Sequence, residues 1–439
     1  MSTPRPIQPL PAPPDVCVHL PGSKSITNRA LLLAALCAQR VTVAHALDSE
    51  DTQVMRESLR RLGFSVEQPQ SDTVVVQGEG GRIPAREAEL WVANAGTAAR
   101  FLTALVALGE GTYRIDGTPR MRQRPVQPLL DALNALGAEA VSELGTGCPP
   151  VLVRARGLRG GEVSVRGDIS SQFLSALMMV SPCAQQTVRI GIEGELVSAP
   201  FVRMTLSMMQ QFGVEARWDE QHAHITVPAP QRYALAGEAV YHVEPDATAA
   251  SYFFAAAAIT GGRVCVRGLN RGSLQGDIRF VDILEQMGCA VRWLPDAVEV
   301  QGTGVLHGVD VNISDISDTF ITLAVVAPFA DSPTRIRGVE HARYQESNRV
   351  SAVATELRRL GVDVEEHIDG LTVYPGAPRE GIVQTYNDHR IAMAFALIGL
   401  RVPGIAIADP ECVQKTFPNF FEKLRELEEA QSEATGYRY

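Results

Sequence analysis

Residues 58–67 read SLRRLGFSVE, and four later stretches repeat their pattern: ALNALGAEAV (132–141), MMQQFGVEAR (208–217), ILEQMGCAVR (283–292) and ELRRLGVDVE (356–365). In each copy we expect an amphipathic helix that ends in an apolar residue and a glycine, followed by a strand. Successive glycines lie 73 to 76 residues apart. Each stands where a helix C-terminus favours a left-handed residue. The pattern therefore predicts a structural repeat.

A second element of the repeat is a stretch of alternating apolar and polar residues. Its six copies are VTVAHAL, TYRIDGT, TVRIGIE, RVCVRGL, TRIRGVE and IAIADPE, which start at Val41, Thr112, Thr187, Arg263, Thr334 and Ile405. The starts step by 71 to 76 residues. Alternation with a period of two indicates half-buried strands.

A third element is a polar turn that opens an Ala/Leu-rich helix. Its six copies span residues 22–36, 93–108, 168–180, 244–259, 315–327 and 386–399. The turns contain the Ser, Asn, Asp and Thr residues that helix starts prefer. The helices are apolar on nearly all sides, so we expect them to be buried.

Six copies in three matching registers predict an α/β protein built from six similar modules. A chain of 439 residues is too long for one compact core. Six modules divide naturally into two groups of three, and the expected boundary lies near residues 237–245. We therefore expect one domain over residues 23–242, and a second one formed by residues 1–22 with 243–439.

The bulk composition excludes several classes of protein. The formal net charge is −10, which argues against wrapping nucleic acid or coating an anionic membrane. Seven scattered cysteines without a CxxC pair indicate neither a disulfide framework nor a zinc site, and suggest a reduced, cytoplasmic protein. No apolar run approaches the length of a membrane helix. No GxGxxG motif follows a strand, so dinucleotide binding is unsupported.

The starts of the buried helices are the expected functional positions. Helix N-termini carry unpaired N–H groups and a partial positive charge, and they bind phosphate and carboxylate groups. If the helices run side by side, their N-termini form a cleft for anionic substrates. The polar residues at these starts include Lys24, Ser25, Arg29, Asn94, Gly96, Ser170, Ser171, Gln172, Asp315, Asp318, Asp388 and Arg390. Loops after the alternating strands add Arg124, Ser198, Glu346, Arg349 and Lys415.

At these residues the chain resembles the EPSP synthase (3-phosphoshikimate 1-carboxyvinyltransferase) family, nearly from end to end. The matching motifs are LPGSKSITNRALLLAAL, LDSEDT, NAGTAARFLTAL, PRMRQRPV, SSQFLSALMM, ELVSAPF, GDIRFVDILEQMG, ESNR, YNDHRIAMAFA and KTFP. The resemblance implies a two-domain inverse α/β barrel of the enolpyruvyl transferase type that closes around its substrates. It also implies enolpyruvyl transfer from phosphoenolpyruvate to phosphoshikimate, by addition and elimination, in a monomer without metal or cofactor.

The resemblance also assigns residues to roles. The phosphoshikimate side would use Lys24, Ser25, Arg29, Ser170, Ser171, Gln172, Ser198, Asp318, His341 and Gln345. The phosphoenolpyruvate side would use Lys24, Asn94, Gly96, Arg124, Gln172, Arg349, Arg390 and Lys415. Catalysis would fall to Asp318, Glu346, Lys24 and Lys415, with Asp318 acting on the hydroxyl, Glu346 on the methylene carbon, and Lys415 sharing the second role. Most of the phosphoshikimate site would lie in the first domain; most of the phosphoenolpyruvate site and the catalytic carboxylates would lie in the second.

The chain departs from the family pattern at three positions. Gln345 replaces a usual Lys, His341 stands where relatives often carry Asn, and Phe101 follows Arg100 where many have Pro. The change at Gln345 leaves open a paralogue with an altered acceptor, or a non-catalytic protein that binds phosphorylated ligands. The sister enzymes that act on a UDP-amino sugar typically carry Cys in the loop matching PRMRQRP, and this loop has none.

Overall fold

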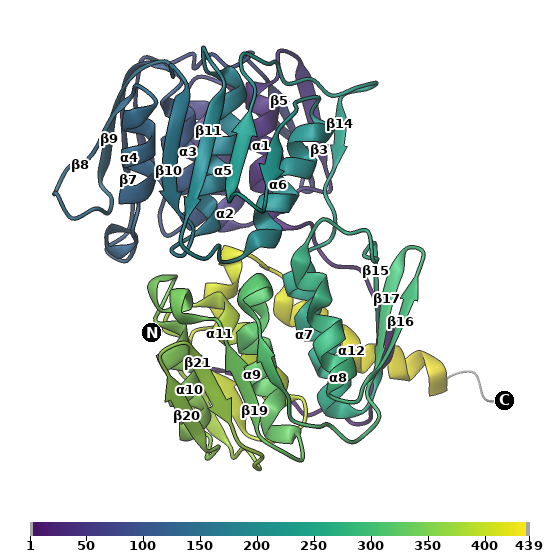
Figure 1. Ribbon diagram of the computed structural model, residues 1–439. Coiled ribbons are helices and arrows are strands. Elements are labelled where there is room, and N and C mark those ends of the chain that lie inside the picture. Colours follow the sequence, from purple (N-terminus) through teal and green to yellow (C-terminus); the bar gives the residue numbers. More distant parts are fainter. Residues whose placement is uncertain (1–2, 436–439) are drawn as a thin grey trace. The chain divides into compact units, whose positions relative to one another are not determined.

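The computed structural model describes residues 3–435, and the side chains of residues 3–428. The protein is a mixed α/β protein with two compact units (Figure 1). Unit 2 is Gly22–Val243, and unit 1 combines Met1–Pro21 with Glu244–Tyr439. The chain therefore passes from one unit to the other twice, and the N-terminal segment belongs to the unit that contains the C-terminal half.

Three apolar helices form the centre of each unit, as the sequence predicts. In unit 2 they are α1 (Lys24–Leu36), α3 (Gly96–Val106) and α5 (Ser171–Val180); in unit 1 they are α7 (Ala247–Thr260), α9 (Phe320–Val326) and α11 (His389–Gly399). Every residue of α3, α9 and α11 is buried. Helices with apolar residues on all sides cannot face water, so the sheets lie outside them. Figure 1 shows the strands of unit 2 lying over α1, α3 and α5.

The strands of unit 2 form three four-stranded sheets. The strands are β3 (Arg40–Ala44), β4 (Ser65–Gln70), β5 (Thr73–Gln77), β6 (Glu87–Trp91), β7 (Glu110–Asp116), β8 (Glu139–Ser142), β9 (Val151–Arg156), β10 (Gly161–Arg166), β11 (Val188–Glu193), β12 (Arg217–Asp219), β13 (His224–Val227) and β14 (Val240–His242). The sheets have the orders β14-β3-β5-β4, β6-β7-β9-β8 and β10-β11-β13-β12. The last strand, β14, pairs in parallel with the first, β3, so the third module closes on the first.

Unit 1 repeats this plan among its described residues, except that its third sheet has three strands. Its strands are β1 (Arg5–Pro6), β2 (Asp15–Val18), β15 (Arg263–Arg267), β16 (Ala290–Leu294), β17 (Ala297–Gln301), β18 (Asp310–Asn312), β19 (Thr334–Arg337), β20 (Val364–His367), β21 (Gly370–Val373), β22 (Gly381–Val383) and β23 (Ile405–Ile407). The sheet orders are β16-β17-β15-β2, β18-β19-β21-β20 and β1-β23-β22. Strand β2, near the N-terminus, pairs in parallel with β15 at the edge of its sheet. Strand β14 takes the same place beside β3 in unit 2.

Amphipathic helices connect the sheet strands. They are α2 (Glu50–Arg61), α4 (Gln127–Ala135), α6 (Ala199–Gln211), α8 (Phe280–Gln286) and α10 (Arg349–Arg359), and α12 (Phe420–Thr435) follows the last module. The five repeated glycines after the connecting helices all have positive φ, from 77° at Gly213 to 109° at Gly137. The predicted helix ends are therefore confirmed, and so are the six alternating strands, which are β3, β7, β11, β15, β19 and β23.

This module plan explains why polar residues gather at helix starts. Within a module, a strand leads into a buried helix, and the next strand returns parallel to the first, as in β6–α3–β7 and β10–α5–β11. The turn before each helix is therefore placed by the sheet on one side and the core on the other.

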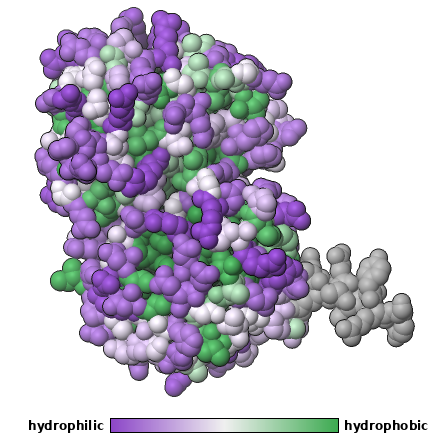
Figure 2. Space-filling view, turned by 45° about the vertical axis from the view of Figure 1, so that its right-hand side comes forward, coloured by the Kyte–Doolittle hydropathy of each residue, from purple (hydrophilic) through white to green (hydrophobic). Residues whose placement is uncertain are grey.

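On the face shown in Figure 2, hydrophilic residues cover most of the surface, with hydrophobic residues in smaller groups between them. Among the described residues, no helix is long and apolar enough to cross a membrane.

Candidate active site

Helix α1 begins with two of the predicted ligand residues, Lys24 and Ser25. Ser23 caps the helix, and its hydroxyl accepts a hydrogen bond from the Ile26 amide at 3.5 Å. Lys24 follows in the first turn, and its Nζ lies 3.6 Å from Oδ2 of the buried Asp51 in α2. Ser25 is half-buried beside it. The start of α1 therefore combines a helix N-terminus with an ammonium group, which suits an anionic ligand.

Arg29 is buried one turn further along α1, and its contacts are with neutral groups. Its Nε donates to Thr205 Oγ1 at 2.8 Å, and Nη2 donates to Ser175 Oγ at 3.0 Å. Its Nη1 donates to the carbonyl of Ser25 at 3.0 Å. Burial lowers the pKa of Arg29 to about 9, and the neighbouring Tyr241 raises it by less. A buried cation without a counterion is costly, and an anionic ligand would offset that cost.

Arg124 is held directly over the start of α3. Its Nη1 donates to the backbone oxygen of Asn94 at 3.0 Å and to the side-chain oxygen at 3.2 Å. A Cβ atom at Gly96 would lie 2.3 Å from Nη2 of Arg124. The absence of a side chain at Gly96 therefore leaves room for the Arg124 guanidinium against the backbone.

The start of α5 supplies uncharged donors. The hydroxyl of Ser170 accepts from the amide of Gln172 at 3.2 Å, so Ser170 is the N-cap, and Ser171 is the buried first residue. The side-chain nitrogen of Gln172 donates to Thr97 Oγ1 in α3 at 3.4 Å. This contact joins the starts of α3 and α5. Ser198 caps α6 with φ of 55°, a left-handed conformation that is uncommon outside glycine.

In unit 1, the buried Arg349 at the start of α10 organises a network of acidic and polar groups. Its Nε donates to Asp388 Oδ2 at 2.8 Å, its Nη2 pairs with Glu346 Oε2 at 2.9 Å, and its Nη1 donates to Gln345 Oε1 at 2.5 Å. Burial lowers the pKa of Arg349, but the carboxylates of Asp388 and Glu346 raise the pKa by more, so the guanidinium stays charged.

Asp318 lies beside two arginines. It is at the end of the 3₁₀ helix η4 (Ser314–Thr319), immediately before α9. Arg390 in α11 donates from Nη2 to Oδ2 at 2.7 Å, and Arg349 Nη1 lies 3.5 Å from Oδ1. Burial lowers the pKa of Arg390, but Asp318 and further acidic neighbours raise the pKa well above its ordinary value. The carboxylate of Asp318 is one-fifth exposed, so it remains accessible to a ligand.

The two remaining predicted residues of unit 1 lie at the edge of this network. His341 lies in η6 (Glu340–Tyr344), and its Nε2 atom is 3.0 Å from Ser317 Oγ. Burial lowers the pKa of His341, more than the neighbouring Asp318 raises it. Lys415 is the last residue of η7 (Pro410–Lys415) and is buried. Burial lowers the pKa of His389 at the start of α11, and the positive charges of Arg390 and Lys415 lower it further.

The structure separates one pair that the sequence places together. Asp315 stands three residues before Asp318 in η4, but it is exposed and pairs with Arg279 at 3.4 Å. It therefore does not join Asp318 beside the arginines. Four further residues hold the predicted ones and were not predicted from the sequence: Ser175 and Thr205 for Arg29, Thr97 for Gln172, and Asp51 for Lys24. Each of these four residues lies within a recognised motif or within one turn of a predicted helix. No other feature of the sequence indicates its role.

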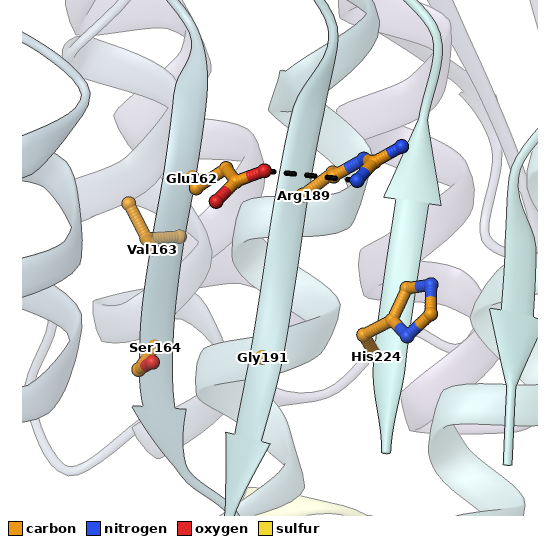
Figure 3. Close-up of a pocket in the computed structure, with 6 residues that line it drawn as sticks. All are labelled: Glu162, Val163, Ser164, Arg189, Gly191 and His224. Carbon is orange, nitrogen blue, oxygen red and sulfur yellow. Dashed lines mark ion pairs between the residues drawn. The ribbon is translucent and has the colours of Figure 1, made fainter. Parts of the chain in front are cut away.

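A separate hollow lies on the outer face of a unit 2 sheet. Its volume is about 380 Å³, and its lining residues come from β10, β11 and β13. Figure 3 shows Glu162 and Arg189 facing each other across two strands; Gly191, without a side chain, leaves space between Ser164 and His224. The ion pair is long, at 3.7 Å. This hollow contains none of the residues predicted to bind substrates.

The described residues include no cluster of three or more His, Cys, Asp or Glu side chains that could hold a metal ion.

The fold and the two sets of residues define an α/β protein of six modules whose helix starts carry cations, hydroxyls and a carboxylate suited to small anionic substrates. The family model of EPSP synthase (3-phosphoshikimate 1-carboxyvinyltransferase) matches residues 12–424. The chain belongs to this family of transferases.

Curated relatives have the same name. A 3-phosphoshikimate 1-carboxyvinyltransferase of Nostoc punctiforme is 48% identical over 418 residues, which cover 94% of this chain and 97% of the relative. A chloroplastic one of Brassica napus is 45% identical over 427 residues, covering 93% and 82%. A solved EPSP synthase structure from Acinetobacter baumannii has a TM-score of 0.80 at 23% identity, covering 97% of this chain and 98% of that one. This last likeness concerns the fold, and it agrees with the expected enolpyruvyl transferase architecture.

Proposed function

We propose that the protein transfers the 1-carboxyvinyl group of phosphoenolpyruvate to the 5-hydroxyl of 3-phosphoshikimate and releases phosphate. The observation that carries this proposal is its family membership, since the match extends over residues 12–424 and the relatives share one name. We further propose that the enzyme acts as a monomer in the cytoplasm. Nothing among these findings favours an altered acceptor or a non-catalytic role.

Unit 2 carries most of the groups that we assign to phosphoshikimate. Arg29 is a buried cation accompanied only by neutral oxygen atoms and aromatic rings among the described residues, so a carboxylate or phosphate would complete its pairing. Ser25, Ser170, Ser171, Gln172 and Ser198 offer hydroxyl and amide donors at helix starts. From unit 1 we add Asp318, His341 and Gln345 to this set.

Phosphoenolpyruvate carries a phosphate and a carboxylate, and planar guanidinium groups match both. We assign it to Arg349, Arg390 and Lys415 of unit 1, and to Lys24, Asn94, Gly96, Arg124 and Gln172 of unit 2. The support is local in each unit: Arg124 is fixed by Asn94, and Arg349 is fixed by Asp388. Arginines held in place before binding lose little freedom when the anion arrives.

The proposed reaction begins when the 5-hydroxyl attacks C2 of phosphoenolpyruvate while C3 takes up a proton. Asp318 accepts the hydroxyl proton, and its 2.7 Å hydrogen bond from Arg390 orients the carboxylate for this role. The ammonium group of Lys415 supplies the proton that the ion-paired Glu346 carboxylate lacks, and Glu346 passes this proton to C3. The tetrahedral adduct then loses phosphate from C2 while C3 returns a proton to Glu346, which restores the C2–C3 double bond. The cationic side chains, with Lys24 among them, stabilise the developing charge on the leaving group.

The test is a turnover assay with phosphoenolpyruvate and 3-phosphoshikimate, in which phosphate release is followed and the organic product is identified by mass spectrometry. We expect release only when both substrates are present, with the carboxyvinyl ether as product. Tight binding of either substrate without turnover would refute the proposal and favour a non-catalytic protein. Turnover only with a different phosphorylated alcohol would instead indicate an altered acceptor.

A further inference from the structure

The turn that precedes α11 contains two consecutive residues in the left-handed backbone region. Tyr386 and Asn387 both have a φ of 54°, and the Asp388 amide closes the turn by donating to the carbonyl of Thr385 at 2.8 Å. Turns with positive φ at both central residues usually contain glycine, asparagine or aspartate there. A bulky residue such as tyrosine rarely adopts this conformation, and such strain persists only where the surrounding structure holds it.

Two residues of the candidate site follow this turn directly. Asp388 caps α11, where its Oδ1 accepts from the Arg390 amide at 3.1 Å, and its Oδ2 accepts from Nε of Arg349 at 2.8 Å. Arg390 lies in the first turn of α11, and its Nη2 donates to Asp318 Oδ2 at 2.7 Å. The path of the turn therefore sets the positions of two arginines that we assign to phosphoenolpyruvate.

The buried carboxylate of Glu356, in α10, holds this turn at two points. Its Oε2 accepts from the Gln384 amide at 2.9 Å, and its Oε1 accepts from the Tyr386 hydroxyl at 2.7 Å. Arg359 compensates the charge of the carboxylate, with Nη1 3.4 Å from Oε1. Glu356 is fully buried, whereas 44% of Tyr386 is exposed. Packing therefore holds the tyrosine ring only in part, and the hydrogen bond to Glu356 fixes its hydroxyl end.

Helix α10 contacts the chain on both sides of the strained residues. Arg349 is its first residue and Glu356 lies seven residues later, so two helical turns, or about 10 Å along the axis, separate them. Residues with this spacing lie on the same face of a helix. Arg349 binds Asp388 after the turn, and Glu356 binds the turn itself and the residue before it. The helix therefore acts as a rigid spacer between the two attachments.

We propose that Glu356 is a positioning residue for the reaction proposed above, on which this role depends. By holding the strained turn against α10, it places Asp388 and Arg390 so that the guanidinium groups of Arg349 and Arg390 are oriented before phosphoenolpyruvate arrives. Arginines that are already oriented lose little freedom on binding. Without Glu356, the backbone at Tyr386 is free to relax toward negative φ, which changes the direction in which the chain enters α11.

The first test is steady-state kinetics with three variants. Tyr386→Phe removes one of the two attachments, Glu356→Gln keeps one acceptor oxygen, and Glu356→Leu removes both. KM for phosphoenolpyruvate should rise about 3- to 10-fold in the first two variants and further in the third, because a hydrogen bond to a charged group shifts an equilibrium by about this much. KM for phosphoshikimate should change less, since most of the groups assigned to it lie in unit 2.

Tyr374→Phe is the matched control. It also removes a hydrogen bond from a tyrosine hydroxyl to a glutamate of unit 1, at 3.4 Å from Oε2 of the exposed Glu365, and neither residue belongs to the candidate site. This variant should keep the wild-type KM for both substrates.

A wild-type KM for phosphoenolpyruvate in both Tyr386→Phe and Glu356→Gln would overturn this role and leave the proposed function intact. An equal rise in KM for both substrates, with a large fall in Tm, would show that Glu356 only stabilises the fold, and would overturn the role as well. Absence of turnover in the wild-type enzyme would instead remove both proposals. Since that result appears in the wild-type measurement, the two failures cannot be confused.

A second measurement does not need turnover. The Asp388 amide is hydrogen-bonded within the turn, so its hydrogen exchange reports whether the turn is held. Exchange over residues 384–390 should be faster in Tyr386→Phe than in the wild-type protein, and unchanged in Tyr374→Phe. Equal exchange in Tyr386→Phe and the wild-type protein would show that the hydroxyl does not hold the turn, and would contradict the proposal.

Discussion

The side-chain oxygen of Gln345 accepts a hydrogen bond from Nη1 of Arg349 at 2.5 Å. At this position the family usually carries Lys, which has no acceptor to offer. In this chain, therefore, Gln345, which departs from the family pattern, helps to hold Arg349, a residue that we assign to phosphoenolpyruvate binding. The acceptor matters because the next oxygen available to Nη1, Asp318 Oδ1, is 3.5 Å away.

Substitution Gln345→Leu should weaken phosphoenolpyruvate binding. It removes the acceptor but keeps a side chain of similar length, and a lost hydrogen bond to a charged group costs about 1.5–3 kcal/mol, or roughly a 10- to 100-fold rise in KM. Steady-state kinetics with varied phosphoenolpyruvate would measure it. Gln286→Leu, on the exposed side of α8, is the control. An unchanged KM in Gln345→Leu would mean that Gln345 does not support Arg349 in the working enzyme.

Substitution Asp318→Asn should abolish most turnover while substrate binding persists. Asparagine keeps the shape and can still accept from Arg390, but it cannot take the hydroxyl proton, and loss of a general base typically costs about 100- to 10,000-fold in rate. Single-turnover kinetics would measure the chemical step, with Asp315→Asn as the control from the same 3₁₀ helix. Near-normal rates in Asp318→Asn would contradict its assignment as the base.

Substitution Arg29→Met should impair phosphoshikimate binding without reducing the stability of the ligand-free protein. The buried guanidinium has only neutral partners among the described residues, so its removal relieves an uncompensated charge but deprives the substrate of a cation. We expect a loss of about 10-fold or more in affinity by calorimetry, together with an unchanged or higher Tm. Arg40→Met, which breaks an exposed pair with Glu67, controls for loss of surface charge. A large fall in Tm would show that Arg29 is mainly structural.

Substitution Gly96→Ala should displace Arg124. The new Cβ would lie 2.3 Å from Nη2 and 2.7 Å from Cζ, closer than any real contact, so the guanidinium must leave its hydrogen bonds to Asn94. The expected result is a higher KM for phosphoenolpyruvate with a smaller change in kcat. Gly376→Ala, where the Cβ would meet nothing within 4 Å, is the control. If Gly96→Ala kept the wild-type KM, the position of Arg124 in the structure would not be the one that binds substrate.

Much of the fold is predictable from the sequence because the same kind of module occurs six times. Each glycine, strand and buried helix is a local signal, and repetition separates it from chance. The helix starts of the candidate site follow from the same repeat. The pairings within the site do not. Arg349 meets Asp388, 39 positions later in the chain, and Arg29 meets Thr205, 176 positions later.

Such contacts depend on how the modules pack, and no local pattern records that. Asp315 shows the limit most clearly. It stands three residues from Asp318 with the same side chain, yet it is turned outward, to Arg279. Asp318 shows the converse, since its setting depends on Arg390 and Arg349 from two other elements.

The way in which unit 1 is assembled from two ends of the chain has a consequence for synthesis on the ribosome. Strand β2 has its partner in β15, at residues 263–267, and β1 has its partner in β23, at residues 405–407. The N-terminal segment must therefore wait, unpaired, while the whole of unit 2 is made and can fold. For β1 the delay extends over nearly the entire chain. A nascent chain stalled before residue 263 would hold a completed unit 2, in which β14 already lies beside β3, preceded by a segment with nothing yet to bind.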